Sequence, residues 1–253
     1  MFNGNTDKEW EKFGKNDPYF GVLTHDKFRK INLTDENKEE FFRSGFNHID
    51  NVLEKIRRHI DQTFTIKKAL DFGCGVGRLV IPLANVALEV TGVDVSDSML
   101  NEAKKNCEAR SLKNVVLVKS DDNLSLSNDK YDFIHSFIVF QHIPVTRGER
   151  IFENLIAHLE SDGICVVHFT YAKTSTIRKI IQFMKKYVPL SSEILNLIMG
   201  QRVFAPQMQM NAYDVNRLFL TMQKANVFGC YSEFTNHGGE LGIVVYFKKP
   251  RMA

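Results

Sequence analysis

The sequence has little cysteine, no long apolar run and no strong excess of charge of either sign. Its four cysteines lie far apart and form no CxxC pair, which argues against a zinc site or a disulfide framework and favours a reduced, cytosolic compartment. The polar start MFNGNTDKEWEKFGK has no signal-peptide core, and no apolar run is long enough to cross a bilayer. A formal net charge of +3 is too small to favour a dedicated nucleic-acid-binding protein.

What the chain does have is enough apolar material for a large core, because 43% of its 253 residues are hydrophobic. From residue 67 onward, short runs rich in valine and isoleucine alternate with helical patterns. This alternation predicts an α/β fold with a Rossmann-like, doubly wound sheet of seven strands, mostly parallel, with helices on both faces. The last two apolar runs flank NHGGE without room for a helix, which predicts an antiparallel C-terminal hairpin.

The expected strands are KKALDFG, LEVTGVDV, NVVLVKS, YDFIHSFIV and GICVVHFT, and the expected helices are RLVIPLANVA, residues 97–110, residues 146–160 and NAYDVNRLFLTMQKAN. We expect a single domain with four parts. These are a helical N-terminal cap (1–66), a cofactor-binding core (67–171), a helical insertion after the fifth strand (172–210), and a C-terminal helix and hairpin (211–253).

Three glycines alternate in LDFGCGVGRL, at the end of the first expected strand. Glycine lets a backbone turn tightly and approach a ligand, and doubly wound sheets bind ligands at the carboxyl ends of their strands. Asp94 ends the second strand, where it can accept hydrogen bonds from ribose hydroxyls. A nicotinamide dinucleotide fits these features equally well. Taken singly, the glycines are also typical of a tight turn, and Asp94 of a helix N-cap.

Three further features separate these interpretations. The glycine spacing is GxGxG, and Arg78 stands where the dinucleotide fingerprint has a small residue. Asp121 and Asp122 end the third strand, where a carboxylate can accept from an adenine amino group, although alone they would be solvated loop acids. The C-terminal hairpin is absent from the standard dinucleotide fold. Together these features argue against a nicotinamide dinucleotide.

Through ALDFGCGVGR, VTGVDVSDSMLNEAKKN, VLVKSDD and YDFIHSFIVFQHIP, in that order, the chain resembles a class I S-adenosylmethionine-dependent methyltransferase. The resemblance covers roughly residues 67–171. It implies S-adenosyl-L-methionine as cofactor and S-adenosyl-L-homocysteine as product. It also implies cofactor-binding residues near the ends of the first four strands: Asp71, Gly73, Cys74, Gly75, Gly77, Arg78, Asp94, Val95, Met99, Asp121, Asp122, Asn123 and Ser136.

The methyl acceptor is expected to be a small molecule. NDPYF is similar to the loop of amino-methylating DNA enzymes, but the segment before it is too polar for a buried strand, so no nucleic-acid partner is expected. DPYFGVLTHDKF instead resembles the aromatic N-terminal segment that folds over the pocket in small-molecule methyltransferases. The expected substrate-binding residues are Tyr19, Phe20, Gln141, Tyr171, Met210 and Tyr213.

Methylation of a hydroxyl calls for a general base, and histidine suits that role near neutral pH. His142, after the fourth strand, is the first candidate catalytic residue, followed by His237 in the hairpin turn and His168 in the fifth strand. The remaining histidines are interpreted as surface or core residues: His25, His48, His59, His135 and His158. No cluster has metal-ligand spacing, so no metal is expected.

The insertion contains an amphipathic segment, STIRKIIQFMKKYVPLSSEILNLIMG. Its apolar face carries Ile177, Ile180, Ile181 and Met184, and its basic residues are Arg178, Lys179, Lys185 and Lys186. This pattern predicts a lid or a homodimer contact. The alternative is a weak peripheral membrane contact, which would suit a lipid-linked glycan substrate.

The leading hypothesis is O-methylation of a small polar molecule, with a sugar or nucleotide-sugar hydroxyl as acceptor. It rests on a resemblance to enzymes of bacterial glycan and natural-product pathways. Two alternatives remain open: N-methylation of a small amine or metabolite, which needs no strong base, and a catalytically silent module that binds S-adenosylmethionine. The intact glycine loop and the acids at the strand ends argue against the silent module.

Overall fold

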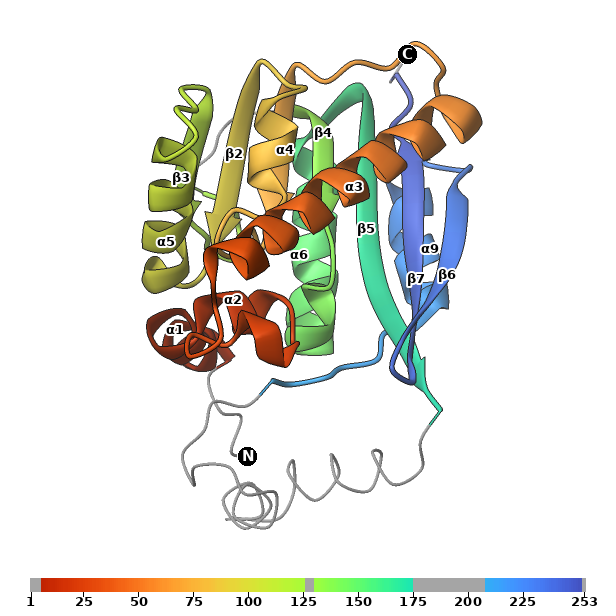
Figure 1. Cartoon of the computed structure of the whole chain (residues 1–253). Coiled ribbons are helices and arrows are strands. Elements are labelled where there is room, and N and C mark those ends of the chain that lie inside the picture. Colours follow the sequence, from red (N-terminus) through yellow and green to blue (C-terminus); the bar gives the residue numbers. More distant parts are fainter. Residues whose placement is uncertain (1–5, 126–129, 175–207, 252–253) are drawn as a thin grey trace.

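The computed structural model describes residues 6–125, 130–174 and 208–251, which form a seven-stranded sheet in the order β3-β2-β1-β4-β5-β7-β6 (Figure 1). Among these strands β7 alone runs in the direction opposite to the other six. The strands are β1 (Lys68–Phe72), β2 (Glu89–Asp94), β3 (Val115–Lys119), β4 (Tyr131–Ser136), β5 (Leu159–Lys173), β6 (Tyr231–His237) and β7 (Glu240–Lys248). The predicted doubly wound sheet with its antiparallel C-terminal hairpin is confirmed.

Helices cover both faces of the sheet, because the strands are apolar on both sides. One face carries α3 (Asp35–His59), α4 (Val80–Ala84) and α5 (Asp97–Glu108), and α3 crosses the strands diagonally in Figure 1. The other face carries α6 (Val145–His158) and α9 (Val215–Lys224). Each face therefore has its own apolar core.

Several elements differ in length from the sequence prediction, and two of them have a clear structural reason. In RLVIPLANVA only α4 is helical. The glycine loop continues as turns up to residue 79, and one of these turns is closed by the hydrogen bond from Gly77 N to Cys74 O. The fifth strand extends beyond GICVVHFT to residues 159–173, because β7 pairs with it as far as Lys173.

The predicted N-terminal cap consists of α1 (Thr6–Asn16), α2 (Pro18–Val22), the short 3-10 helix η1 (Asp26–Phe28) and α3. Helix α1 docks on the start of α5, where the Glu11 carboxylate accepts hydrogen bonds from Ser96 Oγ and Ser98 Oγ at 2.8 and 2.7 Å. Burial works to raise the pKa of Glu11, but these hydrogen bonds lower it to about 2, so the carboxylate stays ionised. The amphipathic segment predicted within the insertion lies outside the described residues.

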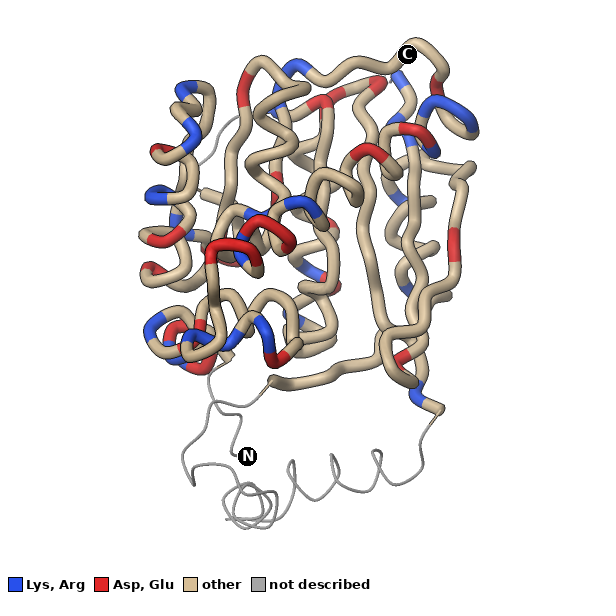
Figure 2. The backbone as a smooth tube through the Cα atoms, in the orientation of Figure 1, with Lys and Arg blue, Asp and Glu red and all other residues tan. Residues whose placement is uncertain are grey.

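Charges of both signs are interspersed along α1, α3 and α5 (Figure 2). Within the described ranges, no helix is both long and apolar enough to cross a membrane. All four cysteines are free, and Cys74, Cys107 and Cys165 are buried.

Candidate active site

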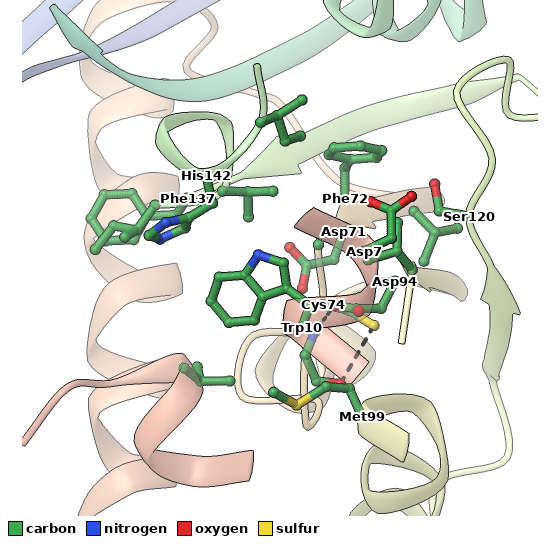
Figure 3. Close-up of a pocket in the computed structure, with 18 of the residues that line it drawn as sticks. Asp7, Trp10, Asp71, Phe72, Cys74, Asp94, Met99, Ser120, Phe137 and His142 are labelled. Atoms are coloured by element: carbon green, nitrogen blue, oxygen red, sulfur yellow. Dashed lines mark hydrogen bonds between the residues drawn. The ribbon is translucent and has the colours of Figure 1, made fainter. Parts of the chain in front are cut away.

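A cavity of about 980 Å³, its open mouth included, lies at the carboxyl ends of β1, β2, β3 and β4. The strand order reverses between β1 and β4, and this switch point is where doubly wound folds bind their ligands. Helices α1 and α2 cover the cavity. Figure 3 shows Trp10 of α1 among residues from the ends of β1, β2 and β4.

Most of the predicted cofactor-binding residues meet in this cavity: Asp71, Gly73, Cys74, Gly75, Arg78, Asp94, Val95, Met99 and Asp122. Gly77 instead packs against Ala103 of α5, and Ser136 Oγ donates to the carbonyl of Phe72. These last two residues hold the loop and the strands together behind the cavity.

The glycine loop has a backbone that other residues could not adopt without strain. Gly73 and Gly75 have φ values of 79° and 54°. A Cβ at Gly73 would lie 2.4 Å from Val139 Cγ2, and one at Gly75 would lie 2.7 Å from Val22 Cγ2. Both glycines therefore keep the backbone close to the cavity, as a ligand-binding cradle requires.

Asp94 ends β2 and lines the cavity directly beside the glycine loop. Its Oδ2 accepts from Gly75 N and its Oδ1 from Ser96 N, both at 2.9 Å. Burial raises its pKa to about 6, although the two backbone N–H groups partly offset that effect. The carboxylate is thus oriented and retains lone pairs for the hydroxyl groups of a ligand.

The two acids after β3 take different positions. Asp122 lines the cavity and forms ion pairs with Arg147 Nε at 2.7 Å and Arg150 Nη2 at 2.8 Å. Asp121 turns away and accepts hydrogen bonds from Asn123 N and from Ser125 within its own loop. Asp121 and Asn123 therefore stabilise the loop conformation and do not line the cavity.

The residues of α2 that line the cavity are not the predicted Tyr19 and Phe20. Because α2 is helical, Gly21 and Val22 face the cavity, whereas Tyr19 points into the core and bonds to Glu102 and Asn106. The Phe20 ring lies under the guanidinium of Arg29, 3.7 Å away. These two placements correct the sequence prediction.

Trp10 is the aromatic residue that reaches the cavity from the cap. Its ring meets His142 edge-on, with 5.0 Å between the ring centroids. It is not among the residues predicted from the sequence, although it is the one tryptophan of the chain and lies in an amphipathic helix.

His142 lies in the short 3-10 helix η2 (Phe140–His142) and lines the cavity, but both of its ring nitrogens are engaged. Nδ1 donates to the carbonyl of Gln209 at 2.7 Å, and Nε2 accepts from the Gln141 amide at 3.1 Å. Thr170 Oγ1 in turn donates to Gln141 Oε1, which orients the amide. Burial lowers the pKa of His142 to about 4, so the ring is neutral.

His168 and His237 flank Phe137, a cavity residue, with ring centroids 5.2 and 5.9 Å from it. His168 is fully buried, and its Nε2 bonds to Thr235 Oγ1 at 2.9 Å across β7. Gly242 permits this bond, because a Cβ there would lie 2.3 Å from His168 Nε2. His237 is exposed at the end of β6, where it pairs with Glu240 of β7, and its ring has no hydrogen bond to another described residue.

The other predicted substrate-binding residues lie outside the cavity. Gln141 supports His142, and Tyr171 contacts Phe234 with 6.2 Å between ring centroids. The carbonyl of Met210 accepts from Lys173 Nζ. Tyr213 is buried against Gly148, and its hydroxyl can donate to the carbonyl of Phe140 or Ile143, each 3.0 Å away.

Tyr213 thereby braces the strained backbone that follows β4. Ile138, which lines the cavity, has a φ of 61°, a value that β-branched residues rarely adopt. Such strain persists only where the surrounding structure enforces it, and it concentrates at functional sites.

Within the described ranges, no group of three or more histidine, cysteine, aspartate or glutamate residues is arranged to hold a metal ion.

The comparisons with known proteins agree with this geometry. Residues 69–163 match the family model described as a methyltransferase domain. The chain is 30% identical over 146 residues to a ubiquinone biosynthesis O-methyltransferase of Rickettsia typhi, covering 56% of this chain and 57% of that protein. The same enzyme of Rickettsia canadensis is 29% identical over 181 residues, covering 69% and 70%. The chain thus spans little more than half the length of the first of these relatives.

Among solved structures, magnesium protoporphyrin IX methyltransferase of Synechocystis PCC 6803 with bound SAH has a TM-score of 0.59 at 17% identity, covering 92% of this chain and 97% of that one. The N-methyltransferase NodS of Bradyrhizobium japonicum has a TM-score of 0.53 at 13% identity, covering 84% and 98%. At these identities the similarity concerns the fold.

Sheet order, glycine cradle and family match together define the class I S-adenosylmethionine-dependent methyltransferases. Residues 69–163 of the chain match a methyltransferase domain, in keeping with that class. The resemblance inferred from the sequence is confirmed, and S-adenosylmethionine is the cofactor of this class.

Proposed function

We propose that this protein transfers a methyl group from S-adenosylmethionine to a hydroxyl oxygen of a small organic molecule. The observation that carries the proposal is the cavity at the β1–β4 switch point, in which a glycine cradle and the Asp94 carboxylate lie side by side. The names of the O-methyltransferase relatives support oxygen as the acceptor atom.

The residues present fit the cofactor. A Cβ on Gly73 or Gly75 would collide with Val139 or Val22, so only glycine lets the backbone run this close to the cavity lining. Asp94 offers carboxylate lone pairs to ribose hydroxyls. Asp71, one strand further along the sheet edge, faces the same cavity. When bound, the cofactor supplies an electrophilic methyl carbon, so the protein's own task is to orient the acceptor and remove its proton.

For the base we propose His237 ahead of His142. A general base needs a free lone pair within reach of the acceptor, and both nitrogens of His142 already have partners. His237 is exposed, lies beside the Phe137 ring, and stands at the same sheet edge as the cavity because β6 runs parallel to β5. Burial lowers its pKa from the usual value, so it is unprotonated at neutral pH.

The acceptor side of the cavity has aromatic walls made by Trp10 and Phe137. Such walls suit a planar ring that carries a hydroxyl, and they also suit the apolar face of a sugar. A phenol, which is a planar ring with a hydroxyl, is therefore one candidate acceptor. The sugar or nucleotide-sugar predicted from the sequence is the other.

The test is turnover of the purified chain with S-adenosylmethionine and three acceptors: a catechol, a nucleotide-sugar and a primary amine. We expect methylation of oxygen, with mass spectrometry identifying the product. His237→Asn should lower kcat by about a hundred-fold, because general-base catalysis contributes roughly 10²–10⁴. It should leave S-adenosylhomocysteine affinity unchanged. The wild-type kcat/KM should rise with pH to a plateau, with a midpoint below 6.5, and His237→Asn should lose this limb.

The matched variant is His142→Asn. If it loses turnover while His237→Asn does not, the base is His142 and the hydroxyl proposal stands. If the primary amine is methylated and the hydroxyl acceptors are not, N-methylation takes the place of the hydroxyl proposal. Tight cofactor binding without turnover on any acceptor would favour the silent module.

A further inference from the structure

Behind the cavity, three polar side chains from separate elements form a hydrogen-bonded row. Asp71 of β1 lines the cavity, and its Oδ1 lies 3.1 Å from His135 Nδ1 of β4. His135 Nε2 lies 3.1 Å from His48 Nε2 of α3. His135 is fully buried and Asp71 nearly so. The row thus connects the cavity to the long helix on the outside of the sheet.

The chemistry of these groups limits where the protons lie. An ionised carboxylate only accepts hydrogen bonds, so the Nδ1–H of His135 donates to Asp71. Between the two Nε2 atoms one ring must donate and the other accept. Burial and the neighbouring His135 lower the pKa of His48 to about 2, so the His48 ring is neutral. His48 therefore completes the hydrogen bonding of His135 without adding charge.

Helix α3 reaches His135 because it lies unusually close to the loop below it. A Cβ on Gly45 would lie 2.2 Å from the carbonyl oxygen of Arg78, so only glycine allows this approach. His48 follows Gly45 by one turn, and its ring packs on Phe137 with 4.2 Å between centroids. The buried guanidinium of Arg78, whose Nη1 donates to Ser44 Oγ, adds positive charge near Asp71.

We propose that His135 and His48 are positioning residues that hold the Asp71 carboxylate for the ammonium group of the ligand's amino-acid part. The inference rests on the proposed function, because it takes S-adenosylmethionine as the ligand. His135 occupies Oδ1, which leaves Oδ2 of Asp71 for the cavity. With the ribose at Asp94 on β2, the amino-acid part extends toward the adjacent strand β1, where Asp71 lies. A carboxylate held in one rotamer binds an ammonium group without having to be ordered first.

The test compares two ligands by calorimetric titration of the full chain. S-adenosylhomocysteine carries the ammonium group, and 5′-methylthioadenosine lacks the amino-acid part. His48→Phe keeps a ring against Phe137 but removes the hydrogen bond to His135. We expect about ten-fold weaker binding of S-adenosylhomocysteine and unchanged binding of 5′-methylthioadenosine. His48→Gln, whose amide can donate or accept, should restore the affinity to within about three-fold.

The control is His59→Phe, at the end of the same helix, where the histidine ring stacks on Tyr231 with centroids 4.0 Å apart. It should change neither affinity. If His48→Phe does not fold, His48→Asn, whose shorter amide does not reach His135, takes its place. The inference would be overturned if His48→Phe weakened the binding of both ligands equally, or if it left the binding of both unchanged. Failure of the wild-type chain to bind S-adenosylhomocysteine would instead overturn the proposed function.

Discussion

At the scale of single residues, the buried carboxylate of Asp94 links the cavity to pH. Its pKa is raised to about 6 by burial, which places its ionisation within the range of ordinary buffers. An ionised carboxylate accepts hydrogen bonds from ribose hydroxyls more strongly than a protonated one does. Cofactor affinity and pH should therefore be linked through this one side chain.

We predict that S-adenosylhomocysteine affinity falls as the pH decreases through about 6, because Asp94 takes up a proton. Asp94→Asn should bind about ten-fold more weakly at pH 7.5, as expected for the loss of a charged acceptor worth roughly 1.5–3 kcal/mol. It should also lose the pH dependence. Calorimetric titrations at pH 5 and 7.5 measure both effects. Equal affinities of wild type at the two pH values would contradict the prediction.

The residues of this site differ in how far the sequence could locate them. Gly73, Gly75 and Asp94 act where a strand ends, so their position follows from the local pattern. Asp121 and Asp122 share the same pattern, and only the salt bridges of Asp122 with Arg147 and Arg150 decide which of them faces the cavity. A pattern can place a loop at the site without stating which side chain turns inward.

At the scale of elements, α1 is held over the cavity by Arg147 of α6. Its Nη1 and Nη2 bond to the Asp7 carboxylate at 2.7 and 3.0 Å, and its Nε bonds to Asp122. Thr6 Oγ1 also donates to the carbonyl of His142. These contacts hold α1 against the cavity, so we expect the mobility of α1 to influence ligand release.

We predict that Arg147→Ala speeds amide hydrogen exchange in α1 by about ten-fold and increases the dissociation rate of S-adenosylhomocysteine. The reason is that a bidentate ion pair and a second carboxylate contact are lost together. The control is Arg217→Ala, which removes the more exposed ion pair between Arg217 on α9 and Glu149 on α6 and should leave α1 unchanged. Unchanged exchange in α1 after Arg147→Ala would show that other contacts hold this helix.

At the scale of the whole molecule, several histidines must remain neutral for the protein to stay folded. Burial lowers the pKa of His142 to about 4 and of His168 to about 3, against an ordinary value of 6.5. The unfolded chain therefore binds more protons than the folded one between those values. The contribution of these neutral histidines to the free energy of unfolding is fully present above pH 6.5. It decreases as the pH falls toward the folded-state pKa values.

We predict that the free energy of unfolding falls between pH 7.5 and 5, by up to about 1.4 kcal/mol per pH unit for each such histidine. Urea unfolding at several pH values measures this slope. His168→Asn should reduce the slope of the free energy of unfolding against pH by the amount that one buried histidine contributes. An identical slope in wild type and His168→Asn would contradict the assignment.

The sequence by itself determined the order of strands and helices, the glycine loop and the acid at the end of β2. These features depend on neighbours along the chain: strand periodicity, a tight turn and a helix start that follow one another. The tertiary structure decided the rest. Asp7 meets Arg147 across 140 positions, His48 meets His135 across 87, and Tyr19 enters the core because α2 packs with its other face toward the cavity. Such contacts depend on how closely helices approach the sheet, and at Gly45 that approach is set by a backbone contact between segments far apart in the chain.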